Sequence, residues 1–218
     1  MSVVGIDGCR GGWIAIVLRP PNAPAAVYVE TLDRIVDEVP DAEAFGIDIP
    51  IGLPTHGRRQ ADTEARSFLG PRRASVFFAP VREALVAPDH AEATRRSKLL
   101  TGQGVSRQAY ALGPKILEVE HWSRQVSTPV WEVHPEVSFA VMLGHPARAP
   151  KKTGAGVLER LRALDREGIP LEELGEAAER AAIDDVLDAE AAAWSADRLL
   201  RGQGMSLPDP PELDPETG

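Results

Sequence analysis

The opening stretch, VVGIDGCRGGWIAIVL, restricts the possible folds of this chain more than any other segment. Two runs rich in β-branched residues flank a glycine-rich turn, and this pattern predicts a β-hairpin as the first element. Asp7 does not fit the apolar pattern around it. A carboxylate at the end of a buried strand is costly unless a cation, a hydrogen-bond donor or water meets it. Asp7 is therefore the first candidate for chemistry.

Length and composition predict one α/β domain. The 218 residues suffice for a single domain with an insertion. No apolar run approaches the roughly 18 residues that span a bilayer, and the N-terminus leads directly into a strand without an export signal. We therefore expect a cytoplasmic protein without membrane contact. Cys9 is the only cysteine, which excludes an internal disulfide and a zinc site built on several thiolates.

The domain is expected to cover residues 1–204, followed by a Pro-rich, acidic tail over residues 205–218. Within it, residues 55–125 read as a helical, basic insertion. Between Arg58 and Lys115 there are 11 Lys and Arg against 5 Asp and Glu, although the whole chain carries a net charge of −9. This split suits a protein that binds phosphate next to an acidic pocket, and it also fits an ordinary Arg-rich helix surface.

Polar residues of this insertion, with one from a later basic loop, are the candidates for contact with substrate. The loop Lys151-Lys152-Thr153-Gly154 is equally consistent with a solvated connection before the next helix. The predicted substrate-binding residues are Arg72, Arg73, Ser75, Ser106, Gln108, Lys115 and Lys152.

Further acids lie at the ends of later predicted strands. Asp48 precedes a segment with two prolines and a glycine, so the backbone leaves the sheet directly after it. Glu132 lies in the strand VWEVHP and projects to the face opposite Trp131. Glu136 falls in the first turn of the following helix, where an acid is favoured for structural reasons alone. We therefore predict Glu132, rather than Glu136, as a site residue.

The predicted last helix, from Ala182 to Leu200, carries the remaining acids. Asp185 and Asp188 are three residues apart, so both can face one ion. Asp184 is explained by its position near the helix N-terminus. Asp188 lies beyond the first turn, among small residues typical of close packing.

We expect these distant acids to converge on a divalent-metal site. Mg²⁺ and Mn²⁺ favour carboxylate oxygens, and two such ions about 4 Å apart can hold a phosphodiester and activate water. The predicted catalytic residues are Asp7, Asp48, Glu132, Asp185 and Asp188, and the predicted metal ligands are Asp7, Asp48, Asp185 and Asp188.

The ordered motifs GIDGCRGGW, IDIPIGLP, RRASVF, GQGVSRQAYALGPKILEVE, WEVHPEVSF, KKTGAG and DDVLDAEAAAW resemble domain of unknown function 429 (DUF429), a family described as predicted RNase H-like nucleases. The resemblance implies an RNase H-like mixed five-stranded sheet flanked by helices. It places first-strand metal ligation on Asp7. The motif DDVLDA is similar to the helix motif of Holliday-junction resolvases, which implies ligand roles for Asp185 and Asp188. The superfamily more often has Glu at its second position, so that role falls on Asp48 or on Glu132.

The sequence leads us to expect a metal-dependent nuclease acting on DNA or RNA, with Mg²⁺ or Mn²⁺ as cofactor. One alternative is a nucleotide-binding protein of the related actin-like ATPase group, in which Gly8, Gly11 and Gly12 approach phosphates. The chain offers no second glycine-rich phosphate loop for that role. Another alternative is a non-catalytic binding protein on the same fold. The oligomeric state stays open, a homodimer included.

Overall fold

The computed structural model describes residues 2–170 and 174–211, which form two compact units. The first unit combines the described parts of Met1–Ile49 and Gln125–Met205, and the second consists of Pro50–Arg124 with residues 206–211. The predicted division into one domain, an insertion over residues 55–125 and a tail stays a prediction, and residues 212–218 of that tail lie outside the described part.

The first unit is built on a five-stranded sheet of mixed direction. Its strand order is β3-β2-β1-β4-β5. β1 pairs antiparallel with β2, and β2 with β3, whereas β1 pairs parallel with β4, and β4 with β5. The predicted opening hairpin and the α/β class are thus confirmed. The strands are β1 (Val3–Cys9), β2 (Gly12–Leu18), β3 (Ala25–Val29), β4 (Ala44–Ile47) and β5 (Val130–Glu132).

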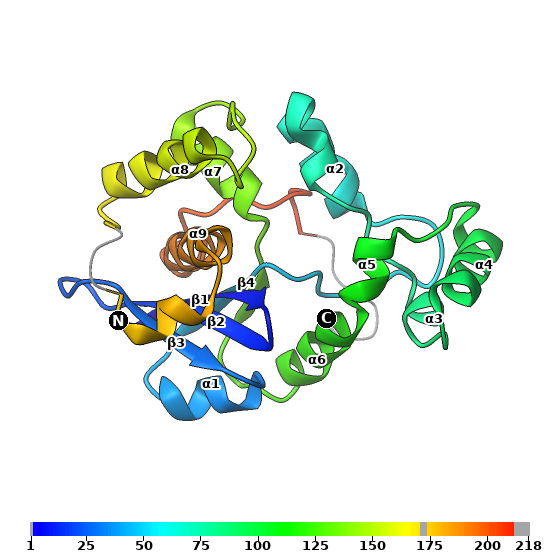
Figure 1. The fold of residues 1–218 in the computed structure, drawn as a ribbon, viewed down its shortest axis with the longest axis horizontal. Helices are drawn as coiled ribbons and strands as arrows, with labels where there is room; N and C mark the ends of the chain where they lie inside the picture. The colour runs from blue at the N-terminus through cyan, green and yellow to red at the C-terminus, as the bar shows by residue number, and fades with distance from the viewer. Residues whose placement is uncertain (1, 171–173, 212–218) are drawn as a thin grey trace. The chain divides into compact units, whose positions relative to one another are not determined.

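Helices lie on both sides of this sheet (Figure 1). The helix α9 contacts β1, β2 and β4 and is itself covered by α7 and α8, whereas α1 packs near β3 on the other side. The helices of this unit are α1 (Asp33–Glu38), α7 (Pro135–Leu143), α8 (Gly154–Arg166) and α9 (Ile183–Leu200), with the short 3-10 helix η2 (Glu176–Arg180).

Two glycines allow α9 to lie unusually close to the sheet. A Cβ atom on Gly5 of β1 would be 2.0 Å from the carbonyl oxygen of Ala189 and 2.0 Å from the amide nitrogen of Ala193. A Cβ on Gly46 of β4 would be 2.5 Å from the carbonyl oxygen of Ala192. Alanines on the helix and glycines on the strands therefore bring the two backbones into contact.

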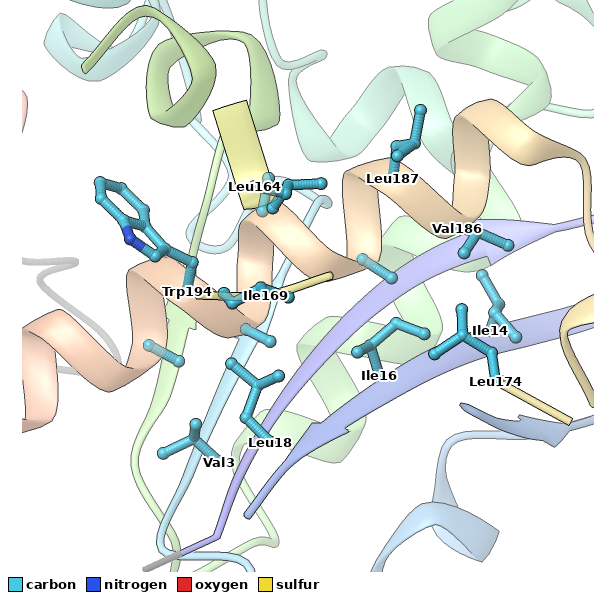
Figure 2. Packing of buried hydrophobic residues seen from close by; sticks show 14 of the residues in the cluster. Val3, Ile14, Ile16, Leu18, Leu164, Ile169, Leu174, Val186, Leu187 and Trp194 are labelled. Carbon is cyan, nitrogen blue, oxygen red and sulfur yellow. The ribbon is translucent and has the colours of Figure 1, made fainter. Parts of the chain in front are cut away.

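The core of the unit fills the space between the sheet and these helices. Figure 2 shows Ile14, Ile16 and Leu18 pointing from the sheet toward α9, where Val186 and Trp194 lie. Ile14 and Ile16 have no exposed surface, so each contributes about 2 kcal/mol of hydrophobic stabilisation. This packing fixes α9, and the acidic side chains it carries, over the first strand.

The second unit is helical. One cluster of its buried residues consists of Val81, Ala84, Ala87, Ala93, Val105 and Ala109. The helical segment that follows Ser106 is divided into two helices, and Gly113-Pro114 begins the second of them. The elements are α2 (Gln60–Leu69), the 3-10 helix η1 (Gly70–Ser75), α3 (Arg82–Leu85), α4 (His90–Thr101), α5 (Arg107–Ala111) and α6 (Gly113–Ser123). Among the described residues, no helix has both the length and the hydrophobicity of a membrane span.

Candidate metal centre

Asp7 and Asp48 lie side by side because their strands run parallel. Ile6 of β1 is in register with Ile47 of β4, and the backbone amide of Asp48 donates to the carbonyl oxygen of Ile6 at 3.0 Å. The chain leaves the sheet after Asp48, so both carboxylates lie at the carboxyl end of neighbouring parallel strands. Ligands of open α/β sheets bind at such strand ends.

Asp188 joins these two residues from α9. The carbonyl oxygen of the following residue, Ala189, lies against Gly5 of β1, two residues before Asp7. The close contact between helix and strand thus places Asp188 over the end of β1. Its side chain is 1 % exposed, and its Oδ1 atom has no hydrogen-bond partner among the described residues.

The three carboxylates form a compact donor set. One oxygen of each of Asp7, Asp48 and Asp188 lies within 4.8 Å of the corresponding oxygens of the other two. Oxygens on opposite sides of one Mg²⁺ are separated by about 4.2 Å, since each Mg–O bond is about 2.1 Å. Small side-chain rotations would therefore let all three residues coordinate one ion. Hard carboxylate oxygens and an unpartnered Oδ1 atom on Asp188 fit Mg²⁺ or Mn²⁺.

Burial and mutual repulsion make the charged form of this cluster unfavourable without a cation. Burial, followed by the negative charges of Asp48 and Asp188, raises the pKa of the Asp7 carboxyl well above its usual value. Burial also raises the pKa of Asp48 and that of Asp188 to about 7, although Lys151 opposes both shifts. Perturbed carboxyl groups that share a site are typical of functional centres, and a divalent ion would relieve the repulsion.

Lys151 is the positively charged residue that contacts this cluster, through Asp188. Its Nζ atom donates to Oδ2 of Asp188. Burial alone would lower the pKa of Lys151, but Asp188, Asp48 and Asp7 hold it above the usual lysine value. The sequence predicted Lys152 as the functional lysine of this loop, and the structure places Lys152 on the surface, 79 % exposed and 3.6 Å from Asp184. The local sequence does not distinguish the two adjacent lysines, and only the contact of their loop with α9 shows which of them reaches Asp188.

A buried ion pair lies next to the cluster. Arg160 of α8 is fully buried and donates to Oε1 of Glu136 at the start of α7. Oε2 of Glu136 has no hydrogen-bond partner among the described residues, and the charge of Glu136 contributes to the raised pKa of Asp48 and Asp188. Glu136 is thus a neighbour of the acid cluster, whereas the sequence favoured Glu132. An acid in the first turn of a helix is favoured for structural reasons alone, so the sequence did not indicate that Glu136 lies near the acid cluster.

The other two predicted catalytic acids lie near the cluster without belonging to the set of three. Asp185 is half-buried on the first turn of α9, and its charge raises the pKa of Asp7 and of Asp48. Glu132 ends β5 with an exposed side chain, and it also raises the pKa of Asp48.

The remaining predicted substrate residues belong to the second unit. Arg72, Arg73 and Ser75 lie in η1, where the Ser75 hydroxyl donates to the carbonyl oxygen of Arg72 at 2.8 Å. Ser106 has a structural role, because its hydroxyl oxygen accepts from the amide of Ala109 at 3.0 Å and caps α5. Gln108 is exposed on α5, and Lys115 is half-buried on α6. Their contact with substrate stays a prediction.

The fold and the site together define an α/β protein with a buried triad of carboxylates that suits a hard divalent cation. The chain belongs to the DUF429 family, because residues 5–213 match the family described as "Protein of unknown function (DUF429)". A search among curated proteins found no match.

Proposed function

We propose that this protein is a nuclease with an RNase H-like fold that hydrolyses phosphodiester bonds of DNA or RNA and depends on Mg²⁺ or Mn²⁺. One observation carries the proposal. Asp7, Asp48 and Asp188 come from three distant segments of the chain, and their ligand atoms lie within 4.8 Å of one another in a mostly buried setting. A single buried acid can have a purely structural role. Three acids that share one largely buried place, with Lys151 as the cation paired to one of them, repel one another and would destabilise the fold without a compensating role.

Two observations support the RNase H-like assignment: the mixed five-stranded sheet, and the position of the carboxylates at the ends of β1 and β4 and on the last helix. These are the positions that the resemblance of the sequence motifs implied. Fold alone does not determine function, so the proposed activity depends on the residues of the site.

In this proposal the three aspartates bind and orient the cations, with Asp185 as a further ligand on the exposed side. The Gly8 amide donates to Oδ1 of Asp7 at 2.6 Å and fixes that carboxylate at the end of β1. Bound divalent ions would supply the positive charge that activates water and stabilises the phosphate in the transition state. The basic residues of the second unit would contact the nucleic-acid backbone.

A cleavage assay with purified protein tests this function. Single-stranded, duplex and branched DNA, with matching RNA substrates, are incubated with Mg²⁺ or Mn²⁺ and with EDTA. We expect metal-dependent cleavage of at least one substrate, and a loss of at least about 100-fold in rate for Asp7→Asn and for Asp188→Asn. Asp197→Asn is the matched control, since Asp197 lies nine residues beyond Asp188 on the same helix and pairs with Arg201 at 2.8 Å.

Cleavage that survives Asp7→Asn would contradict the proposal. Thermal stabilisation by ATP with Mg²⁺, but not by Mg²⁺ alone, together with no cleavage, would favour the nucleotide-binding alternative instead.

A further inference from the structure

We propose that Lys151 is a built-in counter-ion of the carboxylate cluster and competes with the divalent cation for Asp188. This inference rests on the proposed metal-dependent function, and it says that Lys151 regulates how tightly that same site binds its cation. The Lys151 ammonium donates to Oδ2 of Asp188, while Oδ1 of Asp188 has no partner among the described residues. The lysine side chain is 34 % exposed and Asp188 is 1 % exposed, so the lysine reaches inward from the surface to a buried acid.

The lysine also acts on the rest of the cluster. Its charge opposes the shifts that burial and repulsion impose on Asp48 and Asp7. One ammonium therefore compensates part of the charge of three carboxylates, which is the task that a divalent cation performs in the loaded site. The ammonium thus offsets part of the repulsion among the acids without a bound metal.

The backbone that carries Lys151 is anchored independently of the acids. The preceding carbonyl, that of Pro150, accepts from the amide of Thr153 at 3.0 Å and from its hydroxyl at 2.8 Å. Thr153 in turn caps α8 by accepting from the Gly156 amide at 3.1 Å. Buried Arg160 donates to the carbonyl oxygen of Gly156 at 2.9 Å. Because the loop is fixed at these points, a displaced ammonium moves through the rotatable bonds of its own side chain.

Competition follows from the shared position of the two cations. A divalent ion bound to Asp188 would lie within a few ångströms of the ammonium, and like charges repel strongly in a poorly solvated site. The ion must therefore displace Lys151 from Asp188, and the lost ion pair opposes metal binding. Since the lysine is partly exposed, water or a phosphate group can receive the displaced ammonium.

The test measures Mn²⁺ affinity by isothermal titration calorimetry on the full chain at one fixed pH and ionic strength. We expect Lys151→Met to bind Mn²⁺ at least about tenfold tighter than the wild type, because the repulsion and the competing ion pair are both removed. Lys151→Arg keeps the charge and should keep the weaker affinity. Arg34→Met is the control, since Arg34 is 65 % exposed on α1 and pairs with Asp37 at 3.4 Å, and this variant should bind Mn²⁺ as the wild type does.

Equal affinity of the wild type and Lys151→Met, including no binding by either, would overturn the inference. Should Lys151→Met fail to fold, a crystal structure of the wild type with Mn²⁺ decides: Lys151 displaced from Asp188 supports competition, and an intact ion pair beside a bound ion overturns it. These results are separate from the nuclease proposal. Mn²⁺-loaded wild type that cleaves nothing contradicts that proposal, whatever the affinity ratio.

Discussion

Glu190 gives the sharpest quantitative prediction about stability. It lies on α9 with no exposed surface, and neither of its carboxyl oxygens has a hydrogen-bond partner among the described residues. Burial raises its pKa to about 8, from an ordinary glutamate value of 4.5. The native state therefore holds a proton on Glu190 that the unfolded chain releases, and the contribution of this group to stability falls as pH rises from about 4.5 to 8.

The magnitude follows from the two pKa values. Between pH 6 and pH 8, Glu190 should lower the free energy of unfolding by about 2 kcal/mol, because the unfolded carboxyl is already ionised while the folded one is losing its proton. Glu190→Gln keeps the shape of the protonated group and cannot ionise. The variant should therefore lose about 2 kcal/mol less stability than the wild type over this interval.

Urea denaturation followed by circular dichroism at pH 6, 7 and 8, with EDTA and constant salt, measures this difference. Asp48 and Asp188, whose pKa values burial raises to about 7, also titrate in this range, and they contribute equally to both proteins. Glu38→Gln, at an exposed position of α1, is the control and should follow the wild type. Parallel pH dependence of the wild type and Glu190→Gln would refute the reasoning and imply that the Glu190 carboxylate has a charge partner or water.

Three further predictions concern the packing and the ion pairs around the site. Gly5→Ala places a Cβ atom 2.0 Å from the carbonyl oxygen of Ala189, so it should destabilise the protein by about 3 kcal/mol or more. Gly154→Ala is the control and should change the stability little, because no neighbouring atom of the described residues lies within 4 Å of the new Cβ. Equal melting temperatures of the two variants would contradict the close helix–strand contact. Arg160→Met leaves the Glu136 carboxylate buried without its cation, so it should lower the free energy of unfolding, measured by urea denaturation, by about 3–5 kcal/mol. The double variant Arg160→Met/Glu136→Leu should recover most of this loss, and no recovery would contradict an energetic coupling between the two residues. Mn²⁺ at about 100 times its dissociation constant should raise the free energy of unfolding by about 2.7 kcal/mol, and EDTA should reverse the effect; a thermal shift that persists in EDTA would contradict specific binding.

The sequence predicted those parts of the fold that depend on local patterns. The hairpin from Val3 to Leu18, the strand that precedes Asp48 and the long last helix follow from periodicity and from glycine and proline positions, and each is present. The family resemblance is confirmed by the match over residues 5–213. Local sequence signals do not determine where every element ends, because α1 begins after Leu32 without a side-chain cap.

Long-range contacts explain why other residues were missed. The roles of Lys151 and Lys152 differ only through the path of the loop over α9, and the two lysines are identical in local sequence terms. Glu136 lies close enough to the acids to raise the pKa of Asp48 and Asp188, and it is paired in the core with Arg160, 24 positions later in the chain. Glu190 is buried because strands and helices cover α9 on several sides, and these contacts are not encoded in the local sequence around it.

Binding of a divalent cation by Asp7, Asp48 and Asp188 together can be measured by anomalous scattering from a crystal soaked in Mn²⁺. We expect a manganese peak within coordination distance of carboxylate oxygens from β1 and α9, and no peak in crystals of Asp188→Asn. A fully soaked wild-type crystal with no peak between these two elements would contradict this binding.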